Sequence, residues 1–210
     1  MGKIRKVPFE IKNEVVGNKT VLTLSGVVAI PYPWEKEDDT INEKLIRNTL
    51  DGVEGDILIR LNSPGGDSYE GVSICNYLKS LKNYVTVEVT GLAASAASII
   101  AMGADKLVMD IGSNLMIHQA AKMTYGNIEA HNKSINMLDS VNKSITSIYR
   151  VKTGLDIETL DEMLNNETWF TAEEAVEKGF ADEIGNAKVE EESEESDVTD
   201  KYADVINELS

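Results

Sequence analysis

Ser95 is the residue best placed for nucleophilic chemistry. Small residues surround it over 91–103, where a strand expected over 85–89 gives way to a helix expected over 93–102. A hydroxyl at this junction faces the unpaired N–H groups that begin the helix; these can hold an oxyanion, and the alanines let a substrate backbone approach closely. The alternative is a buried small-residue helix that tolerates Ser95 and Ser98. Ser98 lies one helical turn on and is expected to pack rather than to attack.

A histidine and a late acidic segment supply the other residue types that acyl transfer needs. His118 directly follows a short strand expected over 114–117. A serine, a histidine and a carboxylate in that chain order provide a nucleophile, a base that takes its proton and an anion that orients the imidazole. The spacing alone gives no distances, so a structural role for His118 at the end of a buried strand stays open.

A glycine turn over residues 62–68 can supply an oxyanion donor. It ends a strand expected over 57–61 and precedes an amphipathic helix that reaches about Leu81. Two adjacent glycines permit positive φ and expose N–H groups toward the carboxyl ends of the strands, where open α/β folds bind ligands. Ordinary turn chemistry and a phosphate loop are the alternatives, although the turn lacks the lysine of a Walker motif and the full dinucleotide fingerprint.

Composition limits the classes of function. The 210 residues are 42% hydrophobic and 27% charged, enough for one compact domain with a substantial core. A formal net charge of −16 argues against nucleic acid and anionic membranes as partners. Cys75 is the single cysteine, so no intramolecular disulfide forms, and with two histidines little is left for a metal site. No signal segment or apolar span is present, and we expect a soluble, cytoplasmic protein with Cys75 in its core.

The remaining elements alternate between strands and helices, which predicts an α/β fold. Strands are expected over 20–28, 57–61, 106–110 and 181–184; helices are expected over 40–50, 125–152, 155–164 and from a capping box at Thr171 to Gly179. The length of the helix over 125–152 predicts a projecting arm. Its apolar stripe serves either an oligomer contact or packing across the domain.

We divide the chain into an N-terminal segment over 1–18, a domain over 19–185 and an acidic tail over 186–210. The tail is expected to be disordered because it is dominated by acidic residues, and its last residues form either a docking helix or a frayed end. Trp34 lies in a charged, proline-containing connection before the first helix. It is either an interface anchor or an aromatic lid over the core.

Four short motifs, in this order, resemble the Clp protease proteolytic subunit. They are NSPGG at 62–66, GLAAS at 91–95, MIHQ at 116–119 and the segment 171–179, and the resemblance covers roughly residues 56–184. It implies Ser95 as nucleophile and His118 as general base, with the backbone N–H groups of Gly66 and Ala96 forming the oxyanion hole. We expect no cofactor and no metal.

The third member of the triad departs from the family pattern. The family usually has aspartate just before the aromatic segment, and the resemblance places Glu167 at that position. Glutamate has the same charge and one more methylene, so it can orient a histidine from a backbone slightly farther back. An exposed loop carboxylate is the alternative role for Glu167, and Asp161 is the nearest alternative acid.

The resemblance also implies an architecture and partners. The fold would be a crotonase-like β/β/α spiral, with the helix over about 125–152 as a handle that joins two rings of subunits into a barrel. Polypeptide substrates would lie extended beside the strand near Met116 and the glycine turn, bound through backbone hydrogen bonds. The family docks onto an unfoldase ATPase, but here the N-terminal segment, the connection over 31–39 and the acidic tail differ from its pattern.

The features in which this chain departs from the Clp family pattern, including the segment 167–171, resemble those of the Clp-like proteases encoded with viral or prophage capsid genes. That resemblance implies cleavage of scaffold or capsid proteins during head maturation. Three other functions stay open: acyl-CoA chemistry on the related crotonase fold, a catalytically decayed assembly ring, and a serine and lysine dyad. The paired serine and histidine motifs favour a serine endopeptidase over all three.

Overall fold

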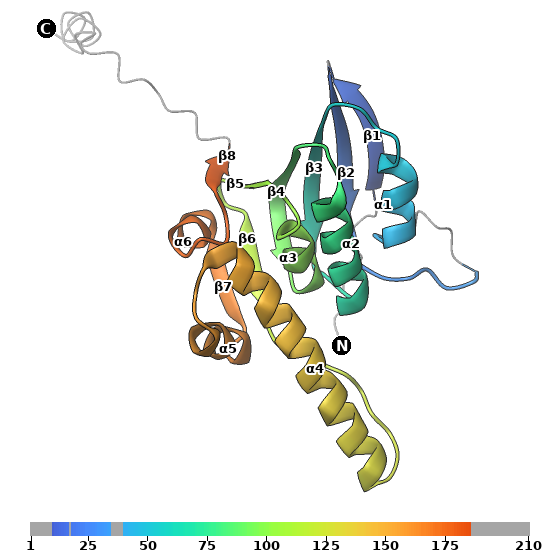
Figure 1. Ribbon diagram of the computed structural model, residues 1–210, viewed down its shortest axis with the longest axis vertical. Helices are drawn as coiled ribbons and strands as arrows, with labels where there is room; N and C mark the ends of the chain where they lie inside the picture. Colours follow the sequence, from blue (N-terminus) through green and yellow to red (C-terminus); the bar gives the residue numbers. More distant parts are fainter. Residues whose placement is uncertain (1–9, 17, 35–39, 186–210) are drawn as a thin grey trace, which may run out of the picture.

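The computed structural model describes residues 10–16, 18–34 and 40–185, in which strands and helices alternate along the chain (Figure 1). The strands are β1 (Glu10–Val16), β2 (Lys19–Ser25), β3 (Asp56–Ser63), β4 (Val85–Ala94), β5 (Lys106–Asp110), β6 (Asn114–Ile117), β7 (Thr168–Thr171) and β8 (Glu183–Gly185). The helices are α1 (Glu43–Leu50), α2 (Ser68–Ser80), α3 (Ala96–Ala101), α4 (Ile128–Thr153), α5 (Ile157–Asn165) and α6 (Ala172–Glu177).

The described strands form one mixed sheet in the order β1-β2-β3-β4-β5-β8, with β6 and β7 attached through β4. The β1–β2 and β6–β7 pairs are antiparallel, and the other pairs are parallel. β4 changes its neighbour along its length. Residues 86–89 pair with β5, and residues 92–94 pair with β6. Because of this change, the C-terminal end of β4 lies beside the C-terminal end of β6. Ser95 follows the first of these strands and His118 follows the second.

Two expectations about strands and helices need correction at their ends. The helix expected over 93–102 begins only at Ala96, because Ala93 and Ala94 pair with Leu115 and Met116 of β6. This sheet pairing overrides the helix propensity of alanine. The strand expected over 20–28 ends at Ser25, and Gly26 at φ 123° ends its regular pairing with β3. The strand β1 was not expected; Val15 and Val16 are 75% and 63% exposed, so these two residues form no buried apolar face.

Three helices lie across one face of the sheet. Figure 1 shows α1, α2 and α3 side by side in front of the strands. Asn42 and Asp67 cap the first turns of α1 and α2 through their side chains, as their residue types favour. Cys75 lies on the inner face of α2 and is fully buried, which confirms the expectation that it is a core residue.

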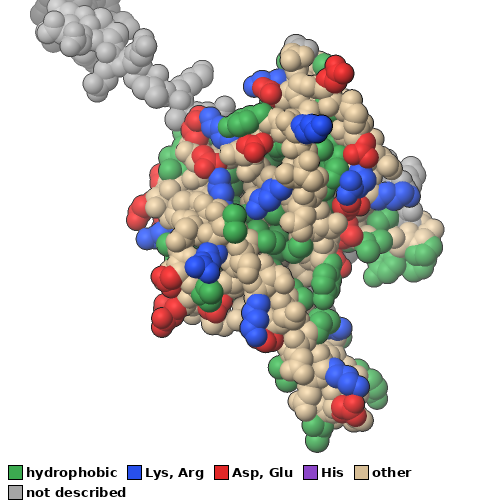
Figure 2. Space-filling model, viewed as in Figure 1, with side chains coloured by type: hydrophobic (Ala, Val, Ile, Leu, Met, Phe, Trp, Pro, Cys, Tyr) green, Lys and Arg blue, Asp and Glu red, His purple; other side chains and the backbone are tan. Residues whose placement is uncertain are grey.

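The long helix α4 is partly packed and partly free. Its 26 residues run from the Asn127 cap to Gly154, which adopts the left-handed conformation at φ 74°. Val141, Ile145 and Tyr149 are buried against the domain, whereas Ile128 is 80% exposed. Figure 1 shows the first half of α4 extending beyond the body, and Figure 2 shows hydrophobic side chains beside a few charged ones on this projecting end. The apolar stripe therefore packs across the domain only in its second half.

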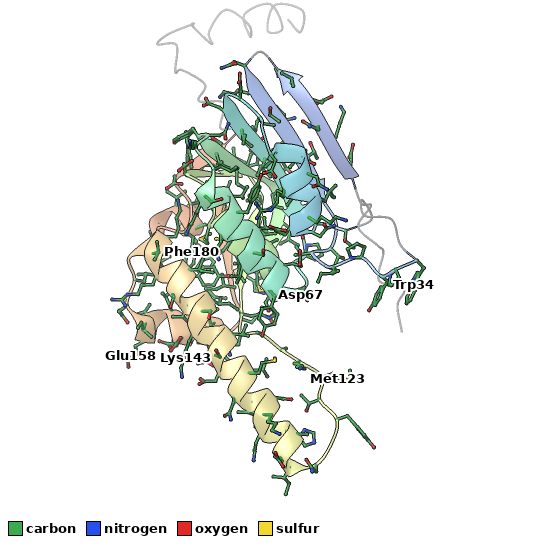
Figure 3. The ribbon with its side chains drawn as sticks, turned by 45° about the vertical axis from the view of Figure 1, so that its right-hand side comes forward. Trp34, Asp67, Met123, Lys143, Glu158 and Phe180 are labelled. Carbon is green, nitrogen blue, oxygen red and sulfur yellow. The ribbon has the colours of Figure 1, made fainter. Side chains whose placement is uncertain are left out.

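Trp34 is not a lid over the core. Its side chain is 79% exposed and stacks on Tyr32, with ring centroids 5.0 Å apart. Figure 3 shows Trp34 on a connection that projects from the body. A role as an interface anchor stays a prediction. The acidic tail and its proposed terminal helix, most of the N-terminal segment and residues 35–39 of the connection lie outside the described residues.

The described part of the chain contains no helix with both the length and the apolar character that crossing a bilayer requires.

Candidate active site

Ser95 lies at a sharp elbow between β4 and α3. Its backbone adopts φ 55° and ψ −122°, a conformation that side-chain-bearing residues rarely take. The Ser95 N–H donates to the Met116 carbonyl oxygen at 2.9 Å, so the elbow is anchored to the end of β6. Such strain is typical of residues at functional sites, where the surrounding structure holds an unfavourable backbone in place.

His118 follows β6 directly and reaches the Ser95 hydroxyl. His118 Nε2 lies 2.8 Å from Ser95 Oγ, which is hydrogen-bonding distance. The next residue, Gln119, donates its backbone N–H to the Leu164 carbonyl oxygen at 3.1 Å and fixes the chain beyond the histidine. For Nε2 to accept the serine proton, the neutral imidazole must carry its own proton on Nδ1.

Glu167 faces the other ring nitrogen. The β6–β7 pairing ends with Ile117 opposite Thr168, so one further step sets His118 beside Glu167. Glu167 Oε2 lies 3.8 Å from His118 Nδ1, an ion-pair distance longer than a hydrogen bond. The Glu167 side chain is 59% exposed. Its Oε1 accepts a long hydrogen bond of 3.4 Å from Trp169 Nε1, which restrains the carboxylate beside the histidine.

Asp161, the alternative acid, is engaged elsewhere. It lies on α5, and its Oδ1 accepts a hydrogen bond of 2.9 Å from the Thr146 hydroxyl of α4. The carboxylate brought against the imidazole is therefore that of Glu167.

The glycine turn packs directly against the Ser95 elbow. Gly65 and Gly66 have φ of 87° and 149°, so both adopt conformations that favour glycine. A Cβ on Gly65 would overlap the Ala94 carbonyl oxygen and would lie 2.8 Å from the Ala96 nitrogen. Ser63 holds the turn by accepting the Gly65 N–H at 3.0 Å. Within the described residues neither the Gly66 nor the Ala96 N–H has a hydrogen-bond acceptor, so both can donate to a ligand.

A cavity of about 440 Å³ opens beside Ser95 and His118. Its apolar wall combines residues of α3, β6 and α4: Ile99, Met116, Leu138, Val141 and Ile145. Asp67 and Lys122 also line the cavity and supply charged groups. The cavity can hold a large apolar side chain next to the serine hydroxyl. Three wall residues come from the apolar stripe of α4, whose periodicity was visible in the sequence although its contribution to a cavity was not.

Two contacts from α4 brace this site, and no sequence pattern predicts either of them. The Tyr149 hydroxyl lies 2.8 Å from Ser98 Oγ, and Ser98 Oγ donates to the Ser95 carbonyl oxygen at 2.6 Å. Ser98 is fully buried, so it packs as expected. On the histidine side, Asn142 accepts the Ala120 N–H at 2.8 Å. Such pairs join residues far apart in the chain through single polar atoms, which no periodic pattern reveals.

The described residues contain no cluster of three or more histidine, cysteine or acidic side chains that could hold a metal ion. Ser95, His118 and Glu167 bring a hydroxyl, an imidazole and a carboxylate together beside two free amides, which is the arrangement that serine hydrolases use.

Comparison with known proteins identifies the family. The model of the Clp protease family matches residues 22–188. The chain is 35% identical over 144 residues to the ATP-dependent Clp protease proteolytic subunit 1 of Protochlamydia amoebophila, covering 65% of this chain and 68% of that protein. It is 30% identical over 141 residues to a proteolytic subunit 1 of Salinibacter ruber, covering 65% of this chain and 59% of that protein. It is 28% identical over 161 residues to a proteolytic subunit 2 of Thermobifida fusca, covering 74% and 79% of the two chains.

The chain therefore belongs to the Clp protease family, whose proteolytic subunits are serine endopeptidases. The mixed sheet with its surrounding helices fits the α/β fold of that family. Proteins of this family form oligomeric rings and act on polypeptides.

Proposed function

We propose that this chain cleaves peptide bonds with Ser95 as nucleophile, His118 as general base and Glu167 as the carboxylate that orients the histidine. The observation that carries the proposal is the 2.8 Å contact between Ser95 Oγ and His118 Nε2. A family match alone leaves the site residues unassigned, whereas this contact joins a strained serine to a base that can take its proton.

In the first half of the reaction, Ser95 Oγ attacks the carbonyl carbon of the scissile bond as its proton passes to His118 Nε2. The carbonyl oxygen becomes an oxyanion, which the N–H groups of Gly66 and Ala96 stabilise. The imidazolium carries a positive charge beside the Glu167 carboxylate. His118 then gives its proton to the departing amine nitrogen, the C–N bond breaks and an ester on Ser95 remains.

In the second half, a water molecule gives a proton to His118 Nε2 and attacks the ester carbonyl. The same two amides hold the second oxyanion. The intermediate collapses, the proton returns to Ser95 Oγ and the carboxylic acid product leaves, so the serine and histidine end in their starting protonation states.

Activity on a panel of fluorogenic peptides tests the assignment. We expect wild-type protein to cleave at least one apolar peptide and Ser95→Ala to lose that activity while keeping its oligomeric state. Ser144→Ala is the matched control, because Ser144 is an exposed serine of α4 whose hydroxyl only donates to the Ser140 carbonyl oxygen. Equal activity in wild type and Ser95→Ala would contradict the proposal.

We propose that the substrate lies extended beside β6 and the glycine turn, with an apolar side chain in the cavity. The support is the apolar wall of Ile99, Met116 and the three residues of α4. Leu138→Trp should narrow the cavity, because Leu138 is a half-buried part of that wall. We expect it to reduce cleavage after large apolar residues while cleavage after alanine persists; a uniform loss for both substrates would contradict this placement.

We propose further that the chain forms a crotonase-like spiral whose α4 acts as a handle between two stacked rings, enclosing the active sites. The exposed apolar residues at the projecting end support this contact: Met123, Tyr125, Ile128 and Ile135 are 60% exposed or more. Ile135→Lys should divide the particle into single rings in sedimentation, whereas Ser144→Lys, on the same helix, should not. Single rings in wild type would contradict the stacked arrangement.

We propose a cytoplasmic location. An unfoldase ATPase is the partner to test, although the N-terminal segment, the connection over 31–39 and the acidic tail depart from the family pattern. Adding a purified Clp ATPase and ATP tests the partner, and we look for cleavage of a folded protein. If the chain cleaves peptides but no Clp ATPase enables it to cleave folded proteins, it acts without this partner.

For the natural substrate we propose the viral or prophage type of function, in which scaffold or capsid proteins are cut during head maturation. The support is the divergent segment 167–171 together with the departures in the N-terminal segment and tail. Purified protein should cut a scaffold or capsid protein encoded with it at discrete sites and leave casein largely intact. The reverse preference would contradict this role.

A catalytically decayed assembly ring is the second candidate. The 3.8 Å separation between His118 Nδ1 and Glu167 Oε2 and the exposure of Glu167 favour it. The two functions differ in the reactivity of Ser95, because a decayed site assembles normally yet forms no covalent adduct with a fluorophosphonate.

A further inference from the structure

Tyr149 of α4 is connected to the Ser95 backbone by a buried chain of hydroxyl groups. The Tyr149 side chain is 1% exposed, and its hydroxyl lies 2.8 Å from Ser98 Oγ. Ser98 is fully buried, and its Oγ lies 2.6 Å from the Ser95 carbonyl oxygen. The two contacts place a side chain of the long helix two hydrogen bonds away from the residue that carries the nucleophilic hydroxyl.

The direction of this chain follows from its atoms. The Ser95 carbonyl oxygen has no proton and can only accept, so the Ser98 hydroxyl donates to it. Ser98 Oγ then keeps its lone pairs, and the Tyr149 hydroxyl donates to one of them. Burial raises the pKa of Tyr149, so its phenol keeps the proton that this chain requires at neutral pH.

The Ser95 backbone needs such restraint. A residue with a side chain at φ 55° is disfavoured, and it stays there only when its neighbours hold it. The Ser95 N–H is held by the Met116 carbonyl oxygen. The Ser95 carbonyl oxygen accepts from the backbone N–H groups of Ser98 and Ile99 at 3.0 and 3.3 Å and, at the shorter distance of 2.6 Å, from the Ser98 hydroxyl. Since the backbone orientation sets the direction of Cβ, these anchors also set where Oγ lies relative to His118 Nε2.

Tyr149 is itself firmly placed. Its ring packs edge-on against Phe180 with centroids 5.7 Å apart, and Phe180 packs against Phe170 at 4.9 Å. All three rings are buried, and Figure 3 shows Phe180 beside the packed end of α4 rather than its projecting end. The hydroxyl therefore has a fixed position from which it can hold Ser98.

We propose that Tyr149 and Ser98 are positioning residues for the proposed reaction: their hydrogen-bond chain holds the Ser95 elbow in the conformation that aims its hydroxyl at His118, and it ties that elbow to α4. The inference rests on the proposed function. Neither side chain has to touch the substrate for this role.

Tyr149→Phe tests the inference with a minimal change, since it keeps the ring packing and removes only the hydroxyl. We expect kcat for a fluorogenic peptide to fall about fivefold to tenfold, the effect of one buried hydrogen bond, with KM unchanged. The rate of Ser95 labelling by a small fluorophosphonate should fall by the same factor, because that reagent needs the serine but few substrate contacts.

A double-mutant cycle separates positioning from general stability. Ser98→Ala should also lower kcat, and adding Tyr149→Phe to it should cause no further loss, because Tyr149 acts through Ser98. Ser98→Ala alone leaves the buried Tyr149 hydroxyl without its partner, whereas the double variant removes both hydroxyls. The thermal stability of the double variant should therefore be higher than that of Ser98→Ala, while its kcat stays low. If the two residues only stabilised the fold, the activity of the double variant would rise together with its stability. Low kcat at higher stability therefore indicates a positioning role.

Tyr77→Phe is the matched control. Tyr77 of α2 is 4% exposed, and its hydroxyl donates to Asp51 Oδ1 at 2.8 Å in a part-buried contact, so this variant also loses one tyrosine hydrogen bond. It should lose stability without losing kcat. The inference is overturned if Tyr149→Phe matches wild-type kcat, or if it lowers kcat equally with and without Ser98. A wild-type ring that neither cleaves nor labels would overturn both the inference and the proposed function.

Discussion

Ser95 and Glu167 are the two non-glycine residues with positive φ in the described part of the chain, at 55° and 49°, and they contact opposite nitrogens of the His118 ring. Ser95 lies between β4 and α3, whereas Glu167 lies between α5 and β7. Two backbone distortions that are costly elsewhere therefore occur on either side of one imidazole. This coincidence is the strongest structural reason to treat Glu167 as part of the site despite its exposure.

Glu167→Gln tests that role. It keeps the shape of the side chain and removes the charge that stabilises the imidazolium, so kcat should fall about tenfold to a hundredfold with assembly retained. The loss should be smaller than in sites with a buried acid, because Glu167 is 59% exposed and solvent screens its charge. Steady-state kinetics on a fluorogenic peptide measures it.

Asp161→Asn is the control for Glu167→Gln. Asp161 accepts from the Thr146 hydroxyl, and an asparagine at this position keeps an acceptor oxygen, so Asp161→Asn should leave kcat at its wild-type value. A larger loss of kcat in Asp161→Asn than in Glu167→Gln would show that Asp161, and not Glu167, orients His118.

His118→Ala should lower kcat/KM by about a thousandfold or more, leaving the contributions of the oxyanion donors and substrate binding. The other histidine provides a control within the same chain. His131 contacts Thr124 Oγ1 at 2.7 Å on the projecting part of α4, away from Ser95. His131→Ala should keep the peptidase activity. Sedimentation must show intact oligomers for both, and unchanged turnover in His118→Ala would refute its role as base.

Gly65→Ala should remove activity as well as stability. The added Cβ would overlap the Ala94 carbonyl oxygen and crowd the Ser95 elbow, and φ of 87° disfavours any side chain. Gly112→Ala is the matched control, because Gly112 has φ of 81° and no atom within 4 Å of an added Cβ. It should lose about 1–2 kcal/mol of stability from φ alone and keep full activity. Thermal melts and peptide kinetics on both variants measure the difference; equal activities would show that the turn tolerates a side chain.

Cys75 should resist thiol reagents in the native protein. It is fully buried, and burial raises the pKa of its thiol, so both access and thiolate concentration are low. A colorimetric disulfide reagent at pH 8 should react at the slow rate of unfolding and then at once after addition of denaturant. Stoichiometric reaction within seconds in native protein would mean that α2 opens readily.

The α/β class and most elements could be predicted because the core strands carry apolar runs and the helices carry clear end signals. The capping box at Thr171 is an example: its hydroxyl accepts the Glu174 N–H, and the Glu174 carboxylate accepts the Thr171 N–H. β1 was missed because its two valines, Val15 and Val16, are adjacent and both exposed, so they give no alternation of buried and exposed positions. The start of α3 was misplaced because the pairing of Ala93 and Ala94 with β6 is a long-range contact that local propensity does not contain.

Within the candidate site, the resemblance to the Clp protease family selects Ser95, His118 and Glu167, with Asp161 as the alternative acid, but it does not show that these side chains meet. Their meeting depends on β4 changing partners and on the β6–β7 register, which are properties of the whole sheet. The Tyr149–Ser98 contact had no precursor in the sequence analysis, because it joins two hydroxyls 51 residues apart.

Covalent labelling of Ser95 measures the central claim most directly. After incubation of the assembled wild-type protein with a small fluorophosphonate, peptide mass spectrometry should find the adduct on Ser95, no adduct in Ser95→Ala and a strongly slowed reaction in His118→Ala. An assembled wild-type particle that forms no adduct, or forms it on a different residue, would contradict the account.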